Sequence, residues 1–272
     1  MTTEDLSLNE TRHRLLEGIL LRLVRRPDAG EFILRGGMLM RSWFRPVPRV
    51  AEDLDFVLTF PLDVQEVARR FMPVVADETV PDGVVFDSER VRFEEIFLDT
   101  GSPGVRVFAS GEAGGVEADF HVDLTFGPPP RPAPVFGEIP ILGGAAPSIA
   151  SQVRLRVCRP ETVVGQKIQA LCHLGMFSWR PKDLNDLRLL TRMSLNDAYL
   201  REAIASYLAD LGRGGEDARA LFGPASWWHM KRSSAIWMDF VKASRGQDVP
   251  KDLASVVAGI ASRLVPILEN LP

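Results

Sequence analysis

The chain changes its hydrophobic pattern near Pro160, and this change limits the folds open to it more than any other feature. Before Pro160, short runs rich in β-branched and aromatic residues alternate with helix-like segments, whereas after it apolar residues recur at helical spacing. We expect strands at residues 31–34, 56–60, 84–86, 91–97, 105–109 and 116–126. We expect helices at residues 6–26, 38–44, 64–75, 161–174, 182–191, 195–211, 224–244 and 251–268. The pattern predicts an α+β half followed by an all-helical half.

A proline-rich segment at residues 127–134 lies near the border between these halves. Proline lacks the backbone N–H that a strand or helix interior needs, so this segment is expected to be a loop. We place the first domain at residues 1–150, as a core with an N-terminal helix. The second, at residues 151–272, is expected to be helical.

The composition is that of an ordinary globular chain. Acidic residues outnumber basic ones by 36 to 32, so the chain as a whole does not attract nucleic acid, although a local basic groove would. Cys158 and Cys172 have no companions at metal-ligand spacing, which argues against zinc and against a disulfide framework. The N-terminus is unlike a secretory signal, and no stretch has the roughly 20 apolar residues that cross a bilayer. We therefore expect a cytoplasmic protein without a membrane partner.

Asp53 and Asp55 stand at the mouth of the apolar strand expected at residues 56–60. Because they are two residues apart in an extended segment, both side chains leave the same face of the sheet. Such a pair and a third carboxylate can share two Mg²⁺ ions roughly 3.5–4 Å apart, which stabilises an in-line phosphoryl displacement. Taken alone, an Asp-x-Asp pair at a strand end more often simply faces water. The pair needs support from elsewhere in the chain.

Asp123 is a candidate for the third carboxylate. Alternation along residues 116–126 places Phe120, Val122, Leu124 and Phe126 on one face, and Asp119, His121, Asp123 and Thr125 on the other. An acid among apolar neighbours is costly to desolvate unless a cation or a hydrogen-bond donor meets it. A solvated sheet face would give the same pattern, so both interpretations stay open.

Two further features fit a phosphate ligand. Arg35-Gly36-Gly37 forms a strand-to-helix turn, where missing side chains let backbone N–H groups and a helix N-terminus approach an anion, although most such turns bind nothing. Lys167 lies within or beside the apolar stripe of the helix expected at residues 161–174. Its ammonium group either extends past its neighbours to solvent or enters a cleft that holds an anionic ligand.

Asp183 and Asp186 are three residues apart and share one helix face. Salt bridges to Arg180, Lys182 or Arg188 would account for them without any ligand.

Three tryptophans near Lys231 and Arg232, namely Trp227, Trp228 and Trp237, could stack on nucleotide bases. Tryptophans at helical spacing are more typical of core packing. The four histidines show no grouping with a nucleophile, so triad chemistry has no support.

Five motifs in order resemble the AbiEii/AbiGii-type nucleotidyltransferase toxin family, part of the polymerase-β-like nucleotidyltransferase superfamily. They are FILRGG at 32–37, RVAEDLDF at 49–56, VDLTFG at 122–127, PETVVGQK at 160–167 and KDLND at 182–186. The C-terminal segment at residues 252–266 is similar to the family's closing helix.

The resemblance implies a polymerase-β-like core with a mixed sheet, followed by a helical half. It implies transfer of a nucleoside monophosphate from an NTP to an acceptor hydroxyl of RNA or protein, with Mg²⁺ or Mn²⁺ as cofactor. By the matching positions, the catalytic and metal-binding residues would be Asp53, Asp55 and Asp123, and the nucleotide-binding residues Arg35, Gly36, Gly37, Lys167, Asp183 and Asp186. Glu161 also matches a family position. Such proteins act as the toxin of a toxin-antitoxin or phage-defence pair, so the expected partners are an NTP, a tRNA-like RNA acceptor and an antitoxin protein.

Three positions, at two places in the chain, depart from the family pattern. Met38 stands where the family usually has Thr or Ser, and Gly165-Gln166 replaces Ala-Glu before Lys167. A hydroxyl and a carboxylate are thereby lost. One alternative is a non-catalytic binding protein of the same fold. Another is an Asp-x-Asp glycosyltransferase using Mn²⁺ and a nucleotide sugar, which would leave Asp123 and Lys167 without roles.

Overall fold

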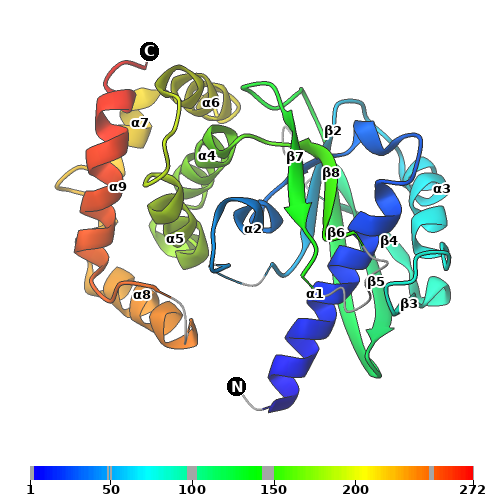
Figure 1. The fold of residues 1–272 in the computed structure, drawn as a ribbon. Coiled ribbons are helices and arrows are strands. Elements are labelled where there is room, and N and C mark those ends of the chain that lie inside the picture. Colours follow the sequence, from blue (N-terminus) through cyan, green and yellow to red (C-terminus); the bar gives the residue numbers. More distant parts are fainter. Residues whose placement is uncertain are drawn as a thin grey trace. The chain divides into compact units, whose positions relative to one another are not determined.

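The computed structural model describes residues 3–47, 49, 51–96, 103–142, 150–244 and 248–271. It divides into two compact units (Figure 1). The first consists of Met1–Pro129 with Pro134–Cys158, and the second of Pro130–Ala133 with Arg159–Pro272. The first unit therefore extends past residue 150, because the last strand of its sheet follows that point.

A mixed sheet forms the centre of the first unit. Its strands are β1 (Ile33–Arg35), β2 (Leu54–Leu58), β3 (Val84–Phe86), β4 (Arg92–Ile96), β5 (Gly104–Ala113), β6 (Val116–Phe126), β7 (Val135–Pro140) and β8 (Gln152–Val157). They follow the order β3-β5-β6-β2-β1-β8-β7, and β4 also pairs with β5. The pairs β2–β6 and β1–β8 are parallel and the other pairs are antiparallel. The α+β class with a mixed sheet is confirmed.

Helices α1 (Thr3–Leu23) and α3 (Val64–Val75) belong to the first unit and contact each other. The apolar stripe of α1 packs on β5 and β6 and is fully buried; it consists of Leu15, Leu16, Ile19, Leu20 and Leu23. Asp63 caps α3, because its side chain accepts a hydrogen bond from the Glu66 N–H at 2.7 Å. The apolar contacts of α1 close one face of the sheet. Polar residues of the strands lie on the other face.

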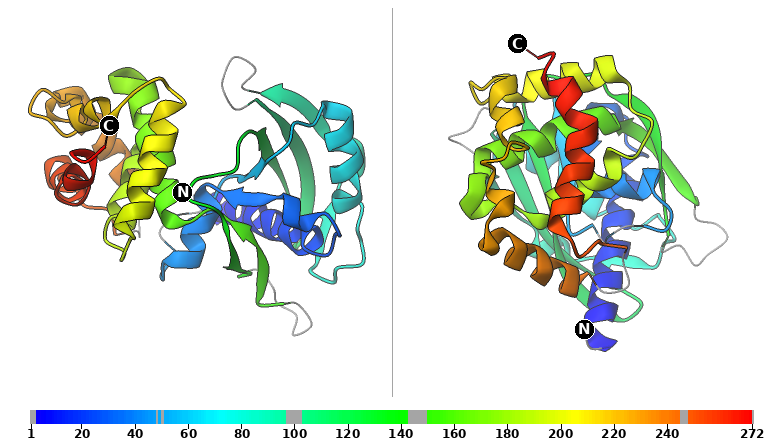
Figure 2. Two further views of the ribbon diagram at one scale, coloured as in Figure 1. Left: turned by 90° about the horizontal axis from the view of Figure 1, so that it is seen from above. Right: turned by 90° about the vertical axis from the view of Figure 1, so that its left-hand side faces the viewer.

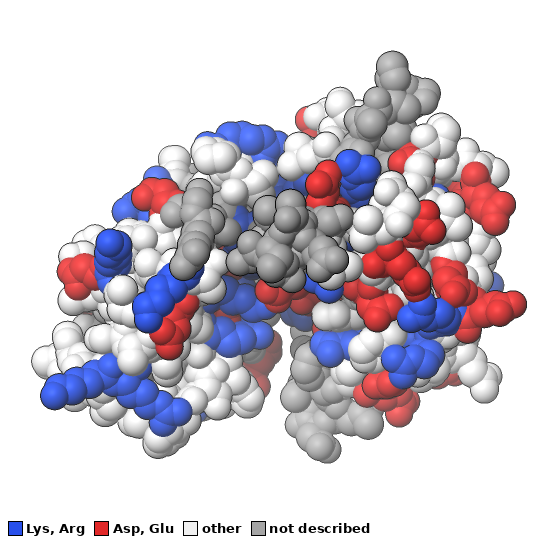
Figure 3. Space-filling model, turned by 90° about the horizontal axis from the view of Figure 1, so that it is seen from below, with Lys and Arg blue, Asp and Glu red and all other residues white. Residues whose placement is uncertain are grey.

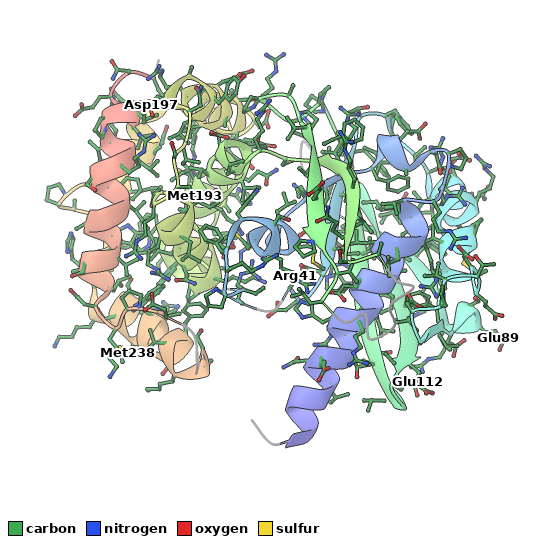
Figure 4. All side chains as sticks on the ribbon, in the orientation of Figure 1. Arg41, Glu89, Glu112, Met193, Asp197 and Met238 are labelled. Atoms are coloured by element: carbon green, nitrogen blue, oxygen red, sulfur yellow. The ribbon has the colours of Figure 1, made fainter. Side chains whose placement is uncertain are left out.

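Two ion pairs lie inside the first unit. Arg22 on α1 meets Asp82 at 2.6 Å, and its guanidinium also donates to the carbonyls of Gly18, Asp77 and Val84. Arg41, on the short helix α2 (Met40–Trp43), meets Glu17 of α1 at 2.5 Å (Figure 4). The side chains of both pairs are almost completely buried, so the attraction of each charge to its partner must offset the cost of removing it from water.

Among the described residues the second unit contains no strand, and Figure 2 shows its helices from two further sides. These helices are α4 (Pro160–Ser178), α5 (Pro181–Leu190), α6 (Asp197–Ala209), α7 (Gly215–Ala220), α8 (Lys231–Ala243) and α9 (Leu253–Leu268). The single helix predicted at 224–244 is wrong at its start: a 3₁₀ turn at Trp227–His229 precedes α8. None of the helices in the described part of the chain has the length and apolarity that would let it cross a membrane.

The tryptophans explain that break. Trp228 is buried and its Nε1–H donates to the Leu221 carbonyl at 2.6 Å, while Trp237 is fully buried and donates to the Pro250 carbonyl at 2.9 Å. Placing both indoles inside requires the chain to turn between them, and Ser226 caps the 3₁₀ turn. Core packing, predicted for these two residues, is confirmed.

Candidate active site

Four neighbouring strands place four charged residues in one row. Arg35 on β1 pairs with Asp55 on β2, Asp55 pairs with Asp123 on β6, and Asp123 pairs with Arg106 on β5. Directly paired residues project from the same face of a sheet, so the row crosses that face as Arg-Asp-Asp-Arg. Asp55 and Asp123, more than sixty positions apart in sequence, are thus immediate neighbours.

Asp53, the residue directly before β2, lies beside this row. Its Oδ2 lies 3.7 Å from Nε2 of His121, which is two residues before Asp123 on β6. The three acids also act together on Arg106. The hydrogen bonding that Arg106 donates to Asp123 is the main cause that raises the pKa of Arg106, and the charges of Asp123, Asp53 and Asp55 raise that pKa further. The three carboxylates therefore form one electrostatic cluster, as their positions in the sequence predict.

Asp123 is held by a two-pronged ion pair with Arg106. Arg106 Nε lies 2.7 Å from Oδ1 of Asp123, and Nη2 lies 2.8 Å from Oδ2. Asp123 is only 5% exposed. The cation that a buried acid requires is thus supplied by the protein itself in this structure.

Two charged side chains pack directly against the backbone of the turn at Gly36 and Gly37. Gly36 has φ of 75°, and a Cβ added there would lie 2.1 Å from Oδ2 of Asp55. A Cβ added at Gly37 would lie 2.7 Å from Nη2 of Arg49. Position 36 requires glycine, because of its positive φ and because a side chain would displace the Asp55 carboxylate, whereas a side chain at position 37 would displace the end of the flexible Arg49 side chain.

The helix predicted at 38–44 is present but shorter than expected. A 3₁₀ turn at Gly37–Leu39 comes first, and α2 is only four residues long. A helix dipole adds little over so short a helix, so an anion at this turn would depend on side-chain cations and single N–H groups. Arg35 is one such cation: its Nε is buried and has no hydrogen-bond partner within the described part of the chain.

Met38 is a core residue in this structure. Its side chain is fully buried, and its sulfur lies 3.4 Å from Nη1 of Arg41. A thioether in this place fills space beneath the turn and offers no hydroxyl to a ligand. The departure from the family pattern at this position thus serves packing.

Lys167, Asp183 and Asp186 belong to the second unit, where they form a buried cluster. Lys167 Nζ lies 2.6 Å from Oδ1 of Asp183 and 3.2 Å from Oδ2 of Asp186. Arg180 Nε lies 2.7 Å from the other oxygen of Asp183. The salt bridge to Arg180 is among those predicted, whereas the sequence analysis missed Lys167 as the partner of both acids. The cluster connects α4 to α5.

The remaining family positions join α4 to its neighbour α6. Glu161 is buried and accepts a hydrogen bond from the Asn196 N–H at 2.8 Å, directly before α6 begins. A Cβ added at Gly165 would lie 2.9 Å from the backbone of Ala203, and Gln166 donates to the Tyr207 hydroxyl at 3.0 Å. The Gly165-Gln166 departure therefore suits close packing of α6 and its tyrosine on α4.

A divalent cation fits the donor chemistry of Asp53, Asp55 and Asp123, because carboxylate oxygens are the ligands that Mg²⁺ and Mn²⁺ prefer. Gly36 provides the space in which the Asp55 carboxylate lies. Within the described residues, however, no group of three or more His, Cys, Asp or Glu side chains is already arranged around a common point. The acids are neighbours, and the third is bound to Arg106.

Sequence reasoning missed two arginines of this site, Arg49 and Arg106. Each left a signal. Arg106 is the only charged residue in the apolar run at residues 105–109, which a buried acid on the next strand explains. Arg49 opens the motif that contains Asp53 and Asp55.

Comparison with known proteins adds family information to this geometry. The sequence profile of a family described as nucleotidyl transferase AbiEii toxin, type IV toxin-antitoxin (TA) system, matches residues 18–255. No curated protein matches the chain. Among solved structures, JHP933 from Helicobacter pylori has a TM-score of 0.51 at 16% identity, over 99% of this chain and 94% of that one. A putative nucleotidyltransferase from H. pylori has a TM-score of 0.47 at 13% identity, over 99% and 96%. The similarity to JHP933 shows a shared fold.

Proposed function

Since this chain belongs to the AbiEii nucleotidyltransferase toxin family, we propose that it transfers a nucleoside monophosphate from an NTP to an acceptor hydroxyl, as the toxin of a toxin-antitoxin pair. Membership of the family confirms the resemblance carried by the five sequence motifs. The observation that carries the proposal is the pairing of Asp55 with Asp123, with Asp53 beside them, on one face of a mixed sheet.

In this proposal Asp53, Asp55 and Asp123 hold Mg²⁺ or Mn²⁺. The bound metal would activate the acceptor hydroxyl and neutralise charge on the pyrophosphate. The acceptor hydroxyl loses its proton to solvent water as its oxygen bonds to the α-phosphorus, the bond to the α–β bridging oxygen breaks, and pyrophosphate leaves. Asp123 lies on the strand farther from the glycine turn, which suits a place beside the acceptor hydroxyl.

Arg35, Gly36 and Gly37 would bind the triphosphate. The support is the buried Nε of Arg35, which has no hydrogen-bond partner in the described part of the chain, on a strand that pairs with β2. A phosphate oxygen would supply the missing acceptor. Lys167, Asp183 and Asp186 stay proposed as nucleotide-binding residues of the second unit, in which the two acids fix the ammonium group.

An RNA acceptor is favoured by the distribution of charge between the units. The first unit has 16 Lys and Arg against 24 Asp and Glu, and Figure 3 shows acidic side chains gathered on its surface. The second unit has 16 Lys and Arg against 12 Asp and Glu. Its positive charge would attract a phosphate backbone that the chain as a whole repels. A cognate antitoxin protein is a further proposed partner, and the cytoplasm is the proposed compartment.

The test is nucleotide labelling with purified protein. Wild-type protein with Mg²⁺, each labelled NTP in turn and total RNA should yield labelled RNA or protein, and Asp53→Asn or Asp55→Asn should abolish it. Asp119→Asn is the matched control, because Asp119 lies on the same strand as Asp123 but is exposed at the far end of β6. Equal labelling by wild type and the two variants would refute the proposal. Binding of Mg²⁺ and NTP without any transfer would favour the non-catalytic alternative.

A further inference from the structure

We propose that Arg106 competes with the divalent cation for Asp123, so that the guanidinium must leave this carboxylate when the metal-bound state forms. The inference rests on the proposed function and adds a positioning residue to it. Arg106 would set how tightly the three acids bind a metal.

The first support is the geometry of the pair. Arg106 meets both oxygens of Asp123, at 2.7 and 2.8 Å. A fork of this kind occupies the two directions in which a carboxylate offers its best lone pairs.

The second support is that the pair is unequally buried. The Asp123 side chain is 6% exposed, whereas that of Arg106 is 31% exposed. Asp123 is therefore fixed by its strand, and the guanidinium can swing away without opening the core. A structural salt bridge of the kind formed by Arg22 and Asp82 buries both partners instead, at 2% and 5% exposure.

The third support is a second place for the guanidinium on the same sheet face. Arg106 pairs across strands with Glu94 of β4, whose side chain is 55% exposed. The ring of Phe108 lies 5.9 Å from the Arg106 guanidinium carbon. Arg106 thus lies between two carboxylates, and a cation bound at Asp123 would shift it toward Glu94 by charge repulsion.

The test measures Mn²⁺ binding by the full-length protein, with calorimetry or the electron paramagnetic resonance signal of free Mn²⁺ as readout. Arg106→Gln should tighten binding about tenfold, the lower end of what a lost charge-assisted hydrogen bond is worth at a partly exposed site. Arg92→Gln is the matched control: Arg92 stacks on the same Phe108 ring at 5.0 Å, and its ion pair is with Glu94. It removes one nearby charge and leaves Asp123 paired.

Further variants make the result decisive. Adding Asp123→Asn to Arg106→Gln should cancel the gain, and Arg106→Lys should fall between wild type and Arg106→Gln, since lysine keeps the charge but loses the fork. Unchanged or weaker binding by a folded Arg106→Gln protein overturns the inference. If Arg106→Gln does not tighten binding while wild type binds Mn²⁺ and Asp53→Asn does not, the proposed metal site stands and the inference falls. If no variant binds Mn²⁺, both fall.

Discussion

Asp55 and Asp123 are direct neighbours on the parallel strands β2 and β6, and Asp55 rests on the backbone of Gly36. Three parts of the chain thus meet at one carboxylate: the turn after β1, the start of β2 and the middle of β6. A parallel register fixes the two acids to the same sheet face. Because Gly36 has no side chain, the Asp55 carboxylate can lie against its backbone, and this contact fixes the position of Asp55 along that face.

The first prediction follows from this contact. Gly36→Ala should reduce transferase activity at least about a hundredfold, because the new methyl would lie 2.1 Å from Oδ2 of Asp55 and a shift of about 1 Å in a catalytic group costs that much. Gly115→Ala is the control for backbone strain, since Gly115 also has positive φ but nothing within 4 Å of its added Cβ. Gly115→Ala should lose about 1 kcal/mol of unfolding free energy from strain in urea melts. Gly36→Ala should lose more, because its ψ of −156° lies in a region open essentially to glycine alone, and only Gly36→Ala should lose the activity. Equal activity in the two would contradict the prediction.

Regular elements with strong patterns could be predicted from the sequence. Helix α3 and strand β6 have the bounds that their periodicity predicts. Strands β7 and β8 were not predicted. Strand β7 contains Gly137 and Pro140, residues that are rare in strands, and its pairing with β8 gives it its conformation, which a local pattern cannot show. Strand β8 alternates the apolar residues Val153, Leu155 and Val157 with polar ones, a local strand signal that the prediction overlooked.

The acids of the site could be predicted and their cations could not. The spacing of Asp53 and Asp55 places these two acids on one face of their strand, and the alternation along β6 places Asp123 opposite the apolar residues of its own strand. That the two faces are the same follows only from the pairing of β2 with β6. The partner of Asp123 is Arg106 on a neighbouring strand, and this pairing depends on a register set by the β5–β6 hairpin. In the second unit, the partner of Asp183 and Asp186 is likewise a residue on another helix, Lys167. Such pairs join residues on different elements, so a pattern within one element does not reveal them.

The second prediction concerns the buried pair of Arg22 and Asp82. Asp82→Ala should lower the unfolding free energy by about 3–5 kcal/mol, because the Arg22 charge would remain buried without its carboxylate. Asp239→Ala removes the partner of Lys242 at a pair that is mostly exposed and should leave stability nearly unchanged. Urea unfolding followed by circular dichroism measures both. A similar loss in the two variants would show that burial of the pair does not matter.

The third prediction is a dependence of stability on pH through His13. Burial, with a smaller contribution from the charge of Arg41, lowers the pKa of His13 from 6.5 to about 4. Between these pH values His13 is protonated in the unfolded chain and neutral in the folded protein. The free energy of unfolding is therefore highest above about pH 6.5 and decreases as the pH falls toward 4. The loss should reach at most about 3 kcal/mol, at 1.36 kcal/mol for each unit of pKa.

The variant His13→Gln isolates this effect. His13 Nε2 accepts a hydrogen bond from the Ala51 N–H at 3.3 Å, two residues before Asp53, and the glutamine amide oxygen, which reaches as far as Nε2, can accept in its place. Urea melts between pH 4 and 7 should show a shallower slope for the variant, because glutamine does not titrate. An identical slope in both proteins would assign the acid sensitivity to other groups.

The fourth prediction concerns the Gly165 departure from the family pattern. Gly165→Ala, which introduces the family's usual residue, should destabilise the protein by about 1–3 kcal/mol, because the added methyl would lie 2.9–3.0 Å from the Ala203 backbone and the Tyr207 ring. Gly259→Ala in α9 is the matched control. Its added Cβ meets nothing within 4 Å, so the higher helix propensity of alanine should stabilise the protein by about 0.5–1 kcal/mol. Opposite signs in thermal melts support close packing of α4 on α6 as the reason for the glycine, whereas stabilisation by both substitutions would rule it out.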